Sequence, residues 1–496
     1  MADVSEIDLK SPSFISVKEI SLRTFSSMRK KYILPFFFSV FLFSFVNAQT
    51  QFQRVFGGVD STQDGLDIKQ TTDGGYIVNS RITTYKANAS CEEAYLIKTD
   101  AMGILQWSKR HEGPNCEEGR AIIQTTDGGY FYAGESKSWG FGGPNDFDVF
   151  ATKTDVSGNI QWTRNIGDVW NDGAFAVDLN TDGSYMFFGM SANMATNGYY
   201  DFYLSKLDVA GNTLWTHTYG GTYLDFGYDM MQANDGGFIM AGSSYPSQVG
   251  GGGTHFYIVK ADVSGTFQWG TLLNGIGDDF ARSVIQTNDG GYIAVGGTQS
   301  FGSGNTDVFL VKTTSSGNVS WTKTYGGFQN DCGMTVKQTS DGGYAVCGGT
   351  NSVGSGGYDL FLMKTNSTGN LLWTKTYGGS ADEGPSGGMF FLFSNTDRDV
   401  SMVNTNDGGF AITSLSNSFP GGNVYLVKTD SDGNSGCNET NGPFLETSPS
   451  PSVTVGGAQT NPVQQVFIPP LCKSILRQQI QMPVIVLRQL LQREAM

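Results

Sequence analysis

The chain has 496 residues, a formal net charge of −15 and a sequence pI of about 4.6, although only 16% of its residues are charged. So acidic a chain repels phosphate groups, which excludes nucleic acid and anionic lipid surfaces as partners. The 67 glycines indicate many turns, and the three histidines offer little for general acid–base catalysis.

The first 48 residues are predicted to be a leader that carries a secretory signal peptide at residues 28–48. A basic start, Met28-Arg29-Lys30-Lys31, precedes an apolar run, and the segment ends in Val46-Asn47-Ala48. This order of basic, apolar and small residues is typical of a cleaved signal peptide. The apolar run is short for a spanning helix, which favours cleavage near Ala48 over the alternative, an N-terminal membrane anchor. We expect a secreted or outer-surface protein with no membrane span after cleavage.

Residues 49–437 consist of one block that recurs seven times around Asp-Gly-Gly-Tyr or a close variant. The blocks are centred at Asp73, Asp127, Asp182, Asp235, Asp289, Asp341 and Asp407. Subtracting successive positions gives periods of 54, 55, 53, 54, 52 and 66 residues. A nearly fixed period in this range indicates a solenoid, an array or a propeller.

Each block offers four strand candidates, which the block around Asp341 illustrates. They span residues 333–338, 343–347, 359–364 and 370–375. The runs are rich in β-branched and aromatic residues and are bounded by Gly, Asn, Asp and Ser, as strands are. The Asp-Gly-Gly and Gly-Asn segments supply the positive φ angles of tight hairpins. An all-β fold is therefore predicted.

The number of copies of each strand predicts how the fold closes. The third strand ends in lysine seven times, at Lys98, Lys153, Lys206, Lys260, Lys312, Lys364 and Lys428. The fourth strand carries tryptophan only six times, at Trp107, Trp162, Trp215, Trp269, Trp321 and Trp373. Residues 51–58 form an extra fourth strand, with Phe52 in the tryptophan position. We predict a seven-bladed β-propeller with four antiparallel strands per blade, in which this N-terminal strand completes the last blade.

Two recurring segments resemble known proteins. Residues 311–321, Val-Lys-Thr-Thr-Ser-Ser-Gly-Asn-Val-Ser-Trp, resemble the Gly-then-Trp docking repeat of quinoprotein-like (PQQ-type) β-propellers. Gln-Thr-x-Asp-Gly-Gly-Tyr repeats joined by Trp-Thr-Lys-Thr-Tyr-Gly-Gly resemble a class of secreted bacterial surface proteins, many with a C-terminal type IX secretion sorting domain. The resemblance covers residues 49–437 and implies a propeller outside the cell. Residues 438–496 depart from that class because no sorting domain is recognisable in them.

Residues 438–496 are predicted to be a linker followed by an unassigned tail. Residues 443–470 are rich in Pro, Ser, Thr, Gly and Val, which is typical of a disordered linker or stalk.

The six cysteines all lie in the exported part, where disulfides form. Proximity in the sequence suggests Cys91 with Cys116, Cys332 with Cys347, and Cys437 with Cys472. The alternative for Cys332 and Cys347 is a pair of buried free thiols.

A carboxylate recurs before the first strand of each block and predicts an acidic ring. Its members are Asp64, Glu118, Asp172, Asp225, Asp279, Asp331 and Asp382. Such a ring around a channel mouth could bind a cation such as Ca²⁺. The favoured alternative is that each carboxylate accepts backbone N–H bonds within its own turn. No cofactor and no other metal is predicted.

The connections between the second and third strands are the least regular segments, and they share one face with the connections between blades. Binding residues concentrate on unequal loops of a rigid scaffold. The predicted ligand face comprises Trp139, Phe141, Tyr245, Phe301, Phe390, Phe391 and Phe393.

The function predicted from the sequence is a secreted, monomeric, non-catalytic binding module for an extracellular glycan or protein. His111, His217 and His255 belong to no constellation, and seven nearly equal blades lack the asymmetry that catalysis needs. One alternative is a quinoprotein-like or polysaccharide-active enzyme on the same scaffold. The other is a structural or adhesive repeat protein.

Overall fold

The structure is a computed structural model, and it describes residues 49–57, 63–86, 89–138, 146–167, 169–192, 200–220, 224–245, 253–377, 379–381, 400–418, 423–436, 439–455 and 478–479. All of them belong to the second of two units, residues 48–496; the first unit is residues 1–47. The predicted signal peptide therefore lies outside the described residues. Within the described part of the chain, no helix is long and apolar enough to cross a membrane.

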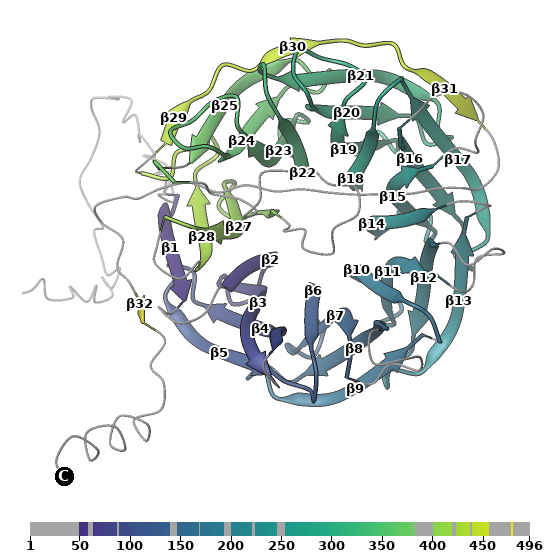
Figure 1. Ribbon diagram of the computed structural model, residues 1–496, viewed down its shortest axis with the longest axis vertical. Helices are drawn as coiled ribbons and strands as arrows, with labels where there is room; N and C mark the ends of the chain where they lie inside the picture. The colour runs from purple at the N-terminus through teal and green to yellow at the C-terminus, as the bar shows by residue number, and fades with distance from the viewer. Residues whose placement is uncertain are drawn as a thin grey trace, which may run out of the picture. The chain divides into compact units, whose positions relative to one another are not determined.

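The repeats fold as antiparallel strands in chain order and form an all-β propeller (Figure 1). The first strands are β2 (Gln63–Gln70), β6 (Glu117–Gln124), β10 (Asp172–Leu179), β14 (Asp225–Gln232), β18 (Asp279–Gln286), β22 (Asp331–Gln338) and β26 (Ser401–Asn404). The second strands are β3 (Tyr76–Lys86), β7 (Tyr130–Ser136), β11 (Tyr185–Ser191), β15 (Phe238–Ser244), β19 (Tyr292–Thr298), β23 (Tyr344–Thr350) and β27 (Phe410–Ser416).

The third strands are β4 (Ala89–Thr99), β8 (Asp148–Thr154), β12 (Asp201–Leu207), β16 (His255–Ala261), β20 (Asp307–Thr313), β24 (Asp359–Thr365) and β28 (Asn423–Thr429). The fourth strands are β5 (Leu105–His111), β9 (Ile160–Ile166), β13 (Thr213–Tyr219), β17 (Phe267–Asn274), β21 (Val319–Gly326) and β25 (Leu371–Tyr377). The remaining strands are β1 (Phe52–Gly57), β29 (Glu439–Asn441), β30 (Leu445–Thr447), β31 (Ser452–Val455) and β32 (Gln478–Gln479).

An ion pair fixes the turn between the first and second strands of every repeat. In the first repeat Asp73 Oδ1 accepts the N–H of Gly75 at 3.0 Å, and Gly74 has a φ of 82°. Lys98 Nζ, from the third strand, lies 2.8 Å from Asp73 Oδ2. The other pairs are Lys153–Asp127, Lys206–Asp182, Lys260–Asp235, Lys312–Asp289, Lys364–Asp341 and Lys428–Asp407. The lysine and aspartate that recur in the sequence are thus one structural unit.

Each fourth-strand aromatic ring packs on the next repeat. The Trp321 ring centroid lies 6.1 Å from that of Tyr344, and an added Cβ on Gly369 would fall 2.7 Å from the Trp321 ring. Phe52 makes the equivalent contacts with Tyr76 and Gly103. Phe52 therefore occupies the tryptophan position, as predicted.

The N-terminal strand pairs with the last repeat, as predicted. Strand β1 runs antiparallel to β28, with Phe52 opposite Lys428 and Phe56 opposite Val424. The first strands contact one another in a closed circuit, from β2 through β6, β10, β14, β18, β22 and β26 back to β2. Apolar cores lie between neighbouring repeats, as where Val295 of β19 and Val346 of β23 share one cluster.

The prediction of seven separate four-stranded blades is wrong for the sheets of the structure. Hydrogen bonds group the described strands into six sheets, and only β10–β13 forms a sheet of four strands. Strands β2 to β9 form a single eight-stranded sheet, because β4 and β6 are joined by a parallel pair between Glu93 and Glu117. Four other sheets gain a fifth strand from the C-terminal part of the chain.

Residues 439–455, which we call the strap, lie within the segment predicted as a linker. Strands β29, β30 and β31 pair antiparallel with the fourth strands β25, β21 and β17 in turn. Figure 1 shows them following one another along the outer edges of these three sheets. Phe444, which lies between β29 and β30 in the sequence, is buried. Its ring packs on that of Phe361, with ring centroids 5.1 Å apart.

One predicted disulfide is present, and a second predicted pair of cysteines is reduced, as the alternative for that pair expected. Cys91 and Cys116 form a disulfide across a Cα–Cα distance of 5.2 Å, as predicted. The predicted bond between Cys332 and Cys347 is absent, and both are buried free thiols. The strand register is the reason, because it places Cys332 opposite Gly349 and not opposite Cys347. Cys437 and Cys472 lie outside the described residues.

Candidate functional site

The strands end on two faces with different character. The register of β2 and β3 sets Gln63 opposite Ile82, so the start of a first strand lies beside the end of a second strand. One face, the loop face, therefore carries the connections between second and third strands and those between repeats. The opposite face, the turn face, carries the Asp-Gly-Gly and Gly-Asn turns.

The six described members of the predicted acidic ring are buried at the starts of the first strands. The most exposed of them, Glu118, has 7% of its surface accessible. Asp331 Oδ2 accepts the N–H of Gly327 and the hydroxyl of Ser352, both at 2.7 Å. Burial, with a smaller contribution from the neighbouring Asp307, raises the pKa of Asp331 to about 6. Asp382 lies outside the described residues.

Asp279 has the same environment as Asp331. It accepts hydrogen bonds from the hydroxyls of Thr298 and Ser300, and burial raises its pKa to about 6. Asp331 thus accepts a backbone N–H from the segment that precedes it, whereas Asp279 accepts hydroxyl groups from the end of β19 and the residues after it. Among the residues the structure describes, no group of three or more His, Cys, Asp or Glu side chains could hold a metal ion.

These raised pKa values predict a dependence of stability on pH. A buried aspartate that ionises near pH 6 in the folded state and near pH 3.8 in the unfolded state costs stability as the pH rises from about 4 to 6. The free energy of unfolding of the wild type, relative to Asp331→Asn, should fall by on the order of 2 kcal/mol across that window. Urea unfolding of both proteins at pH 4 and pH 7 measures it. A constant difference would show that Asp331 titrates normally.

The predicted ligand-face residues are only partly within the described chain. Tyr245 follows β15 and is half-buried, and burial raises its pKa to about 12. Phe301 is also partly buried and packs on Phe309, with ring centroids 5.8 Å apart. Trp139, Phe141, Phe390, Phe391 and Phe393 lie outside the described residues.

Sequence reasoning missed four exposed apolar residues on the loop face. Ile276 and Phe328 are 90% and 81% exposed, and Val169 and Trp170 are each more than half exposed. Val169, Ile276 and Phe328 occupy the same repeat position, three residues before the first-strand aspartate. The available signal in the sequence was an apolar residue at a connection between repeats, a type of segment that is short and otherwise polar or rich in glycine.

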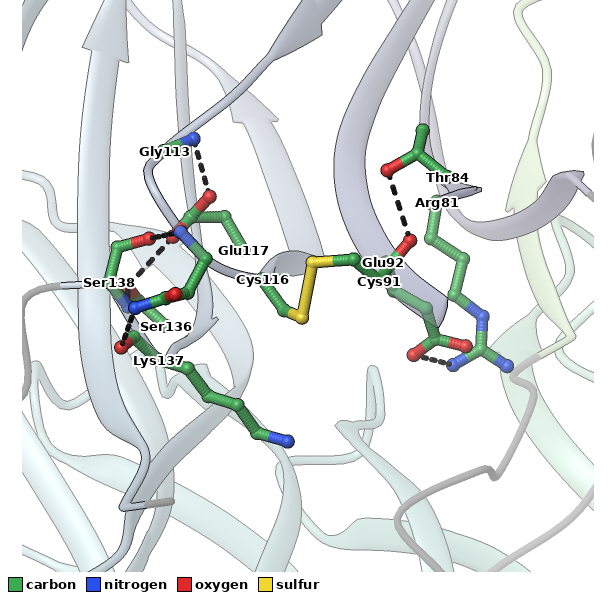
Figure 2. The surroundings of a disulfide bond; sticks show 11 residues. Arg81, Thr84, Cys91, Glu92, Gly113, Cys116, Glu117, Ser136, Lys137 and Ser138 are labelled. Carbon is green, nitrogen blue, oxygen red and sulfur yellow. Dashed lines mark hydrogen bonds and ion pairs between the residues drawn. A yellow bond between two sulfur atoms is a disulfide. The ribbon is translucent and has the colours of Figure 1, made fainter. Parts of the chain in front are cut away.

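The first two repeats carry the strongest departure from the pattern. Strands β3 and β4 have 11 residues each, whereas the second and third strands of the other repeats have seven. The Cys91–Cys116 disulfide fastens β4 to the segment that enters β6. Figure 2 shows the disulfide between Arg81 and Glu92 on one side and Gly113, Glu117 and Ser138 on the other.

A buried ion network underlies this hairpin. The guanidinium of Arg81, 1% exposed, lies 2.7 Å from Asp64, 2.5 Å from Glu118 and 3.1 Å from Glu92. Arg120 extends the network to Glu135 at 3.3 Å. Burial, together with the charge of Glu118, raises the pKa of Glu92 to about 7. Removing one partner of such a network leaves an uncompensated buried charge, which destabilises the structure around it.

Two of the hollows in the described part of the chain bear on the site. The first, about 110 Å³, is lined by first strands and holds the Asp67–Lys69 ion pair and Arg282, which stacks on Tyr228 at 4.3 Å. That volume suits a few waters, not the ligands that small-molecule sites of about 300–1,000 Å³ take. The second, about 470 Å³, lies on the turn face beside Trp373 and Phe410.

The solved structures that resemble this chain include several distant likenesses. No protein-family model and no curated protein matches the chain. Among solved structures, a protein of unknown function from Dyadobacter fermentans aligns over 77% of this chain and 98% of its own length, at 12% identity and a TM-score of 0.41. Sqt1 from Chaetomium thermophilum aligns over 77% and 99%, at 11% identity and a TM-score of 0.38. The WD40 domain of Pan2 from Neurospora crassa aligns over 60% and 94%, at 11% identity and a TM-score of 0.34. Likenesses this distant carry no argument about function.

Proposed function

We propose that this protein is a secreted or cell-surface β-propeller that binds an extracellular glycan or protein without catalysing a reaction on it. The observation that carries the proposal is the asymmetry of the loop face. A long hairpin fastened by a disulfide lies there in the first repeat, and the hairpins of the other repeats are shorter. Several exposed apolar side chains also lie there, at positions that are polar or glycine in other repeats. A unique ligand needs a surface that the repeats do not all share.

The exposed residues favour a protein partner. Val169, Ile276 and Phe328 are aliphatic or aromatic side chains that a partner would remove from water, and Trp170 would add a large anchoring ring. Trp170 is also the residue on which a sugar ring would stack, which keeps a glycan as the second partner class.

Enzymatic function has less support from the side chains. Asp279 and Asp331, whose pKa values are raised, are buried, and Glu92, whose pKa is also raised, is about one-third exposed. Each of the three is hydrogen-bonded or belongs to an ion network. Such perturbed groups also arise in purely structural networks. A monomeric member of the secreted Asp-Gly-Gly-Tyr repeat class, exported by a type IX or related route, fits the proposed role.

The proposal is tested by finding a ligand and then mapping it. The full chain is screened on a glycan array and in pull-downs from extracellular protein. The double substitution Trp170→Ala/Phe328→Ala should weaken the binding found by at least tenfold, because buried aromatic anchors dominate interface energies.

The matched control is Val263→Ser, which changes an exposed apolar residue on the turn face. It should leave the affinity unchanged. If the ligand instead protects the hollow beside Trp373 and Phe410 from hydrogen exchange, the loop-face assignment is wrong.

A further inference from the structure

The strap shows how the outer edges of this fold bind an extended segment. On β25 the strap sets Glu439 opposite Tyr377 and Thr440 opposite Thr376. On β21 it sets Glu446 opposite Tyr325 and Thr447 opposite Thr324. The same Glu-Thr dipeptide is therefore used twice, in the same register, against the same Lys-Thr-Tyr stretch of a fourth strand.

A glutamate of the strap lies near a lysine of the fourth strand on both β21 and β25. Glu446 forms an ion pair with Lys323, and its second oxygen accepts the N–H of Leu371 at 2.8 Å. Glu439 lies 3.6 Å from Lys375. The hydroxyls of Thr324 and Thr447 are bonded at 2.5 Å. An edge lysine and an incoming glutamate are thus part of the recognition.

Three fourth strands end their sheets without such a cover in the described part of the chain. These are β5, β9 and β13. The position of Lys323 is taken there by Lys109, Arg164 and His217. Lys109 makes the same contact with the next repeat as Lys323 does, because its Nζ lies 3.2 Å from Asn159 and that of Lys323 lies 3.2 Å from Asn370.

The uncovered edges also remain open to solvent. Thr324 and Thr376, which face the strap, are buried, whereas Arg110 of β5 is exposed and Asn165 of β9 is half-exposed. Lys109 and Arg164 place positive charge on two neighbouring edges of a chain whose net charge is −15, whereas Arg110 is already paired with Glu112. An open strand edge with unpaired backbone groups accepts a further strand readily.

We propose that the outer edges of β5 and β9 bind an extended segment of a partner protein, in which an acidic residue is followed by threonine. The segment adds to the sheet antiparallel, in the register that the strap uses on β21 and β25. Its acidic residue pairs with Lys109 or Arg164. The partner is a different protein, because the strap of this chain already occupies β17, β21 and β25.

The experiment uses the full chain and a fluorescent synthetic peptide with the sequence of residues 439–449. Fluorescence anisotropy should show saturable binding, and raising the salt concentration should weaken it. The variant Lys109→Glu/Arg164→Glu should lower the affinity at least tenfold. The matched control Lys137→Glu, a charge reversal on the loop face, should not change it.

A second measurement needs no change in the protein. A peptide with both glutamates replaced by glutamine should bind at least tenfold more weakly to the wild type. The proposal is overturned if the two peptides bind equally, or if Lys323→Glu and not Lys109→Glu/Arg164→Glu abolishes binding. It is also overturned if light scattering shows that the edges are filled by a second copy of the chain.

Discussion

Deleting residues 49–57 is expected to abolish cooperative folding, which makes this the largest effect that we predict. The deletion removes β1, in which Phe52, Val55 and Phe56 are buried, and exposes the edge of β28. Each lost phenylalanine costs about 3–5 kcal/mol by comparison with core truncations. Two of them approach the total stability of about 5–15 kcal/mol that domains have.

The deletion also separates the beginning and the end of the repeats. Gln53 of β1 bonds the hydroxyls of Tyr425 and Ser435, and Phe52 packs on Tyr76 of the first repeat. Urea unfolding and size-exclusion chromatography should show a non-cooperative, aggregating protein. Phe52→Trp is the control, because the other fourth strands carry tryptophan at this position, and it should fold normally. A monomeric truncated protein that melts like the wild type would contradict the closure.

The sequence predicts the local structure of this fold well. The Asp-Gly-Gly turns, the order of the strands and the pairing of residues 52–56 with the last repeat follow from motifs that recur at a fixed period. Phe52 was identifiable because it fills a position that is tryptophan in the other repeats. Such features depend on residues that are near each other in the sequence, or on how many copies of each strand the sequence contains.

The arrangement of the sheets was less predictable, for identifiable reasons. The parallel pair of Glu93 and Glu117 joins two repeats, and nothing in either glutamate signals it before Cys91 and Cys116 are known to be bonded. The strap strands have only three or four residues each and lie in a segment whose composition is typical of a linker. Their recognition depends on Glu-Thr pairs facing distant lysines, which no local pattern shows.

The candidate site was predicted only in part. The loop face follows from the topology, and Tyr245 and Phe301 lie near it, but both are packed against the protein. Ile276 and Phe328 were missed because their position is polar or glycine in other repeats, as at Asn115 and Gly379. The exposed fraction of a single side chain depends on the residues that pack around it. Comparing the repeats of one sequence with each other does not reveal that packing.

The contact between Trp321 and Gly369 is expected to show how neighbouring repeats are held together. Trp321→Ala should lower the free energy of unfolding by about 3 kcal/mol, the lower end of the range for core aromatics, because the ring is only partly buried. Gly369→Ala should also destabilise, for two reasons. Its φ is 79°, and the new methyl group would lie 2.7 Å from the Trp321 ring.

A control separates these two costs. Gly342 has a φ of 82°, but an added Cβ there meets nothing within 4 Å. Gly342→Ala should therefore cost only the strain of a left-handed alanine, about 1–2 kcal/mol. Gly369→Ala should cost clearly more than that in the wild type. Once Trp321 has been replaced by alanine, the cost of Gly369→Ala should fall toward that of Gly342→Ala, because the closest contact is gone and only the flexible Lys323 side chain, 3.1 Å away, remains.

Urea unfolding of the single and double variants gives the coupling energy between the two positions. We expect a coupling of at least about 1 kcal/mol, which is above the error of additivity for independent sites. If Gly369→Ala and Gly342→Ala cost the same in the wild type, or if the effects of the two substitutions simply add, the tryptophan does not hold the next repeat through this glycine. The recurrence of Gly and Trp in the sequence would then reflect the turn alone.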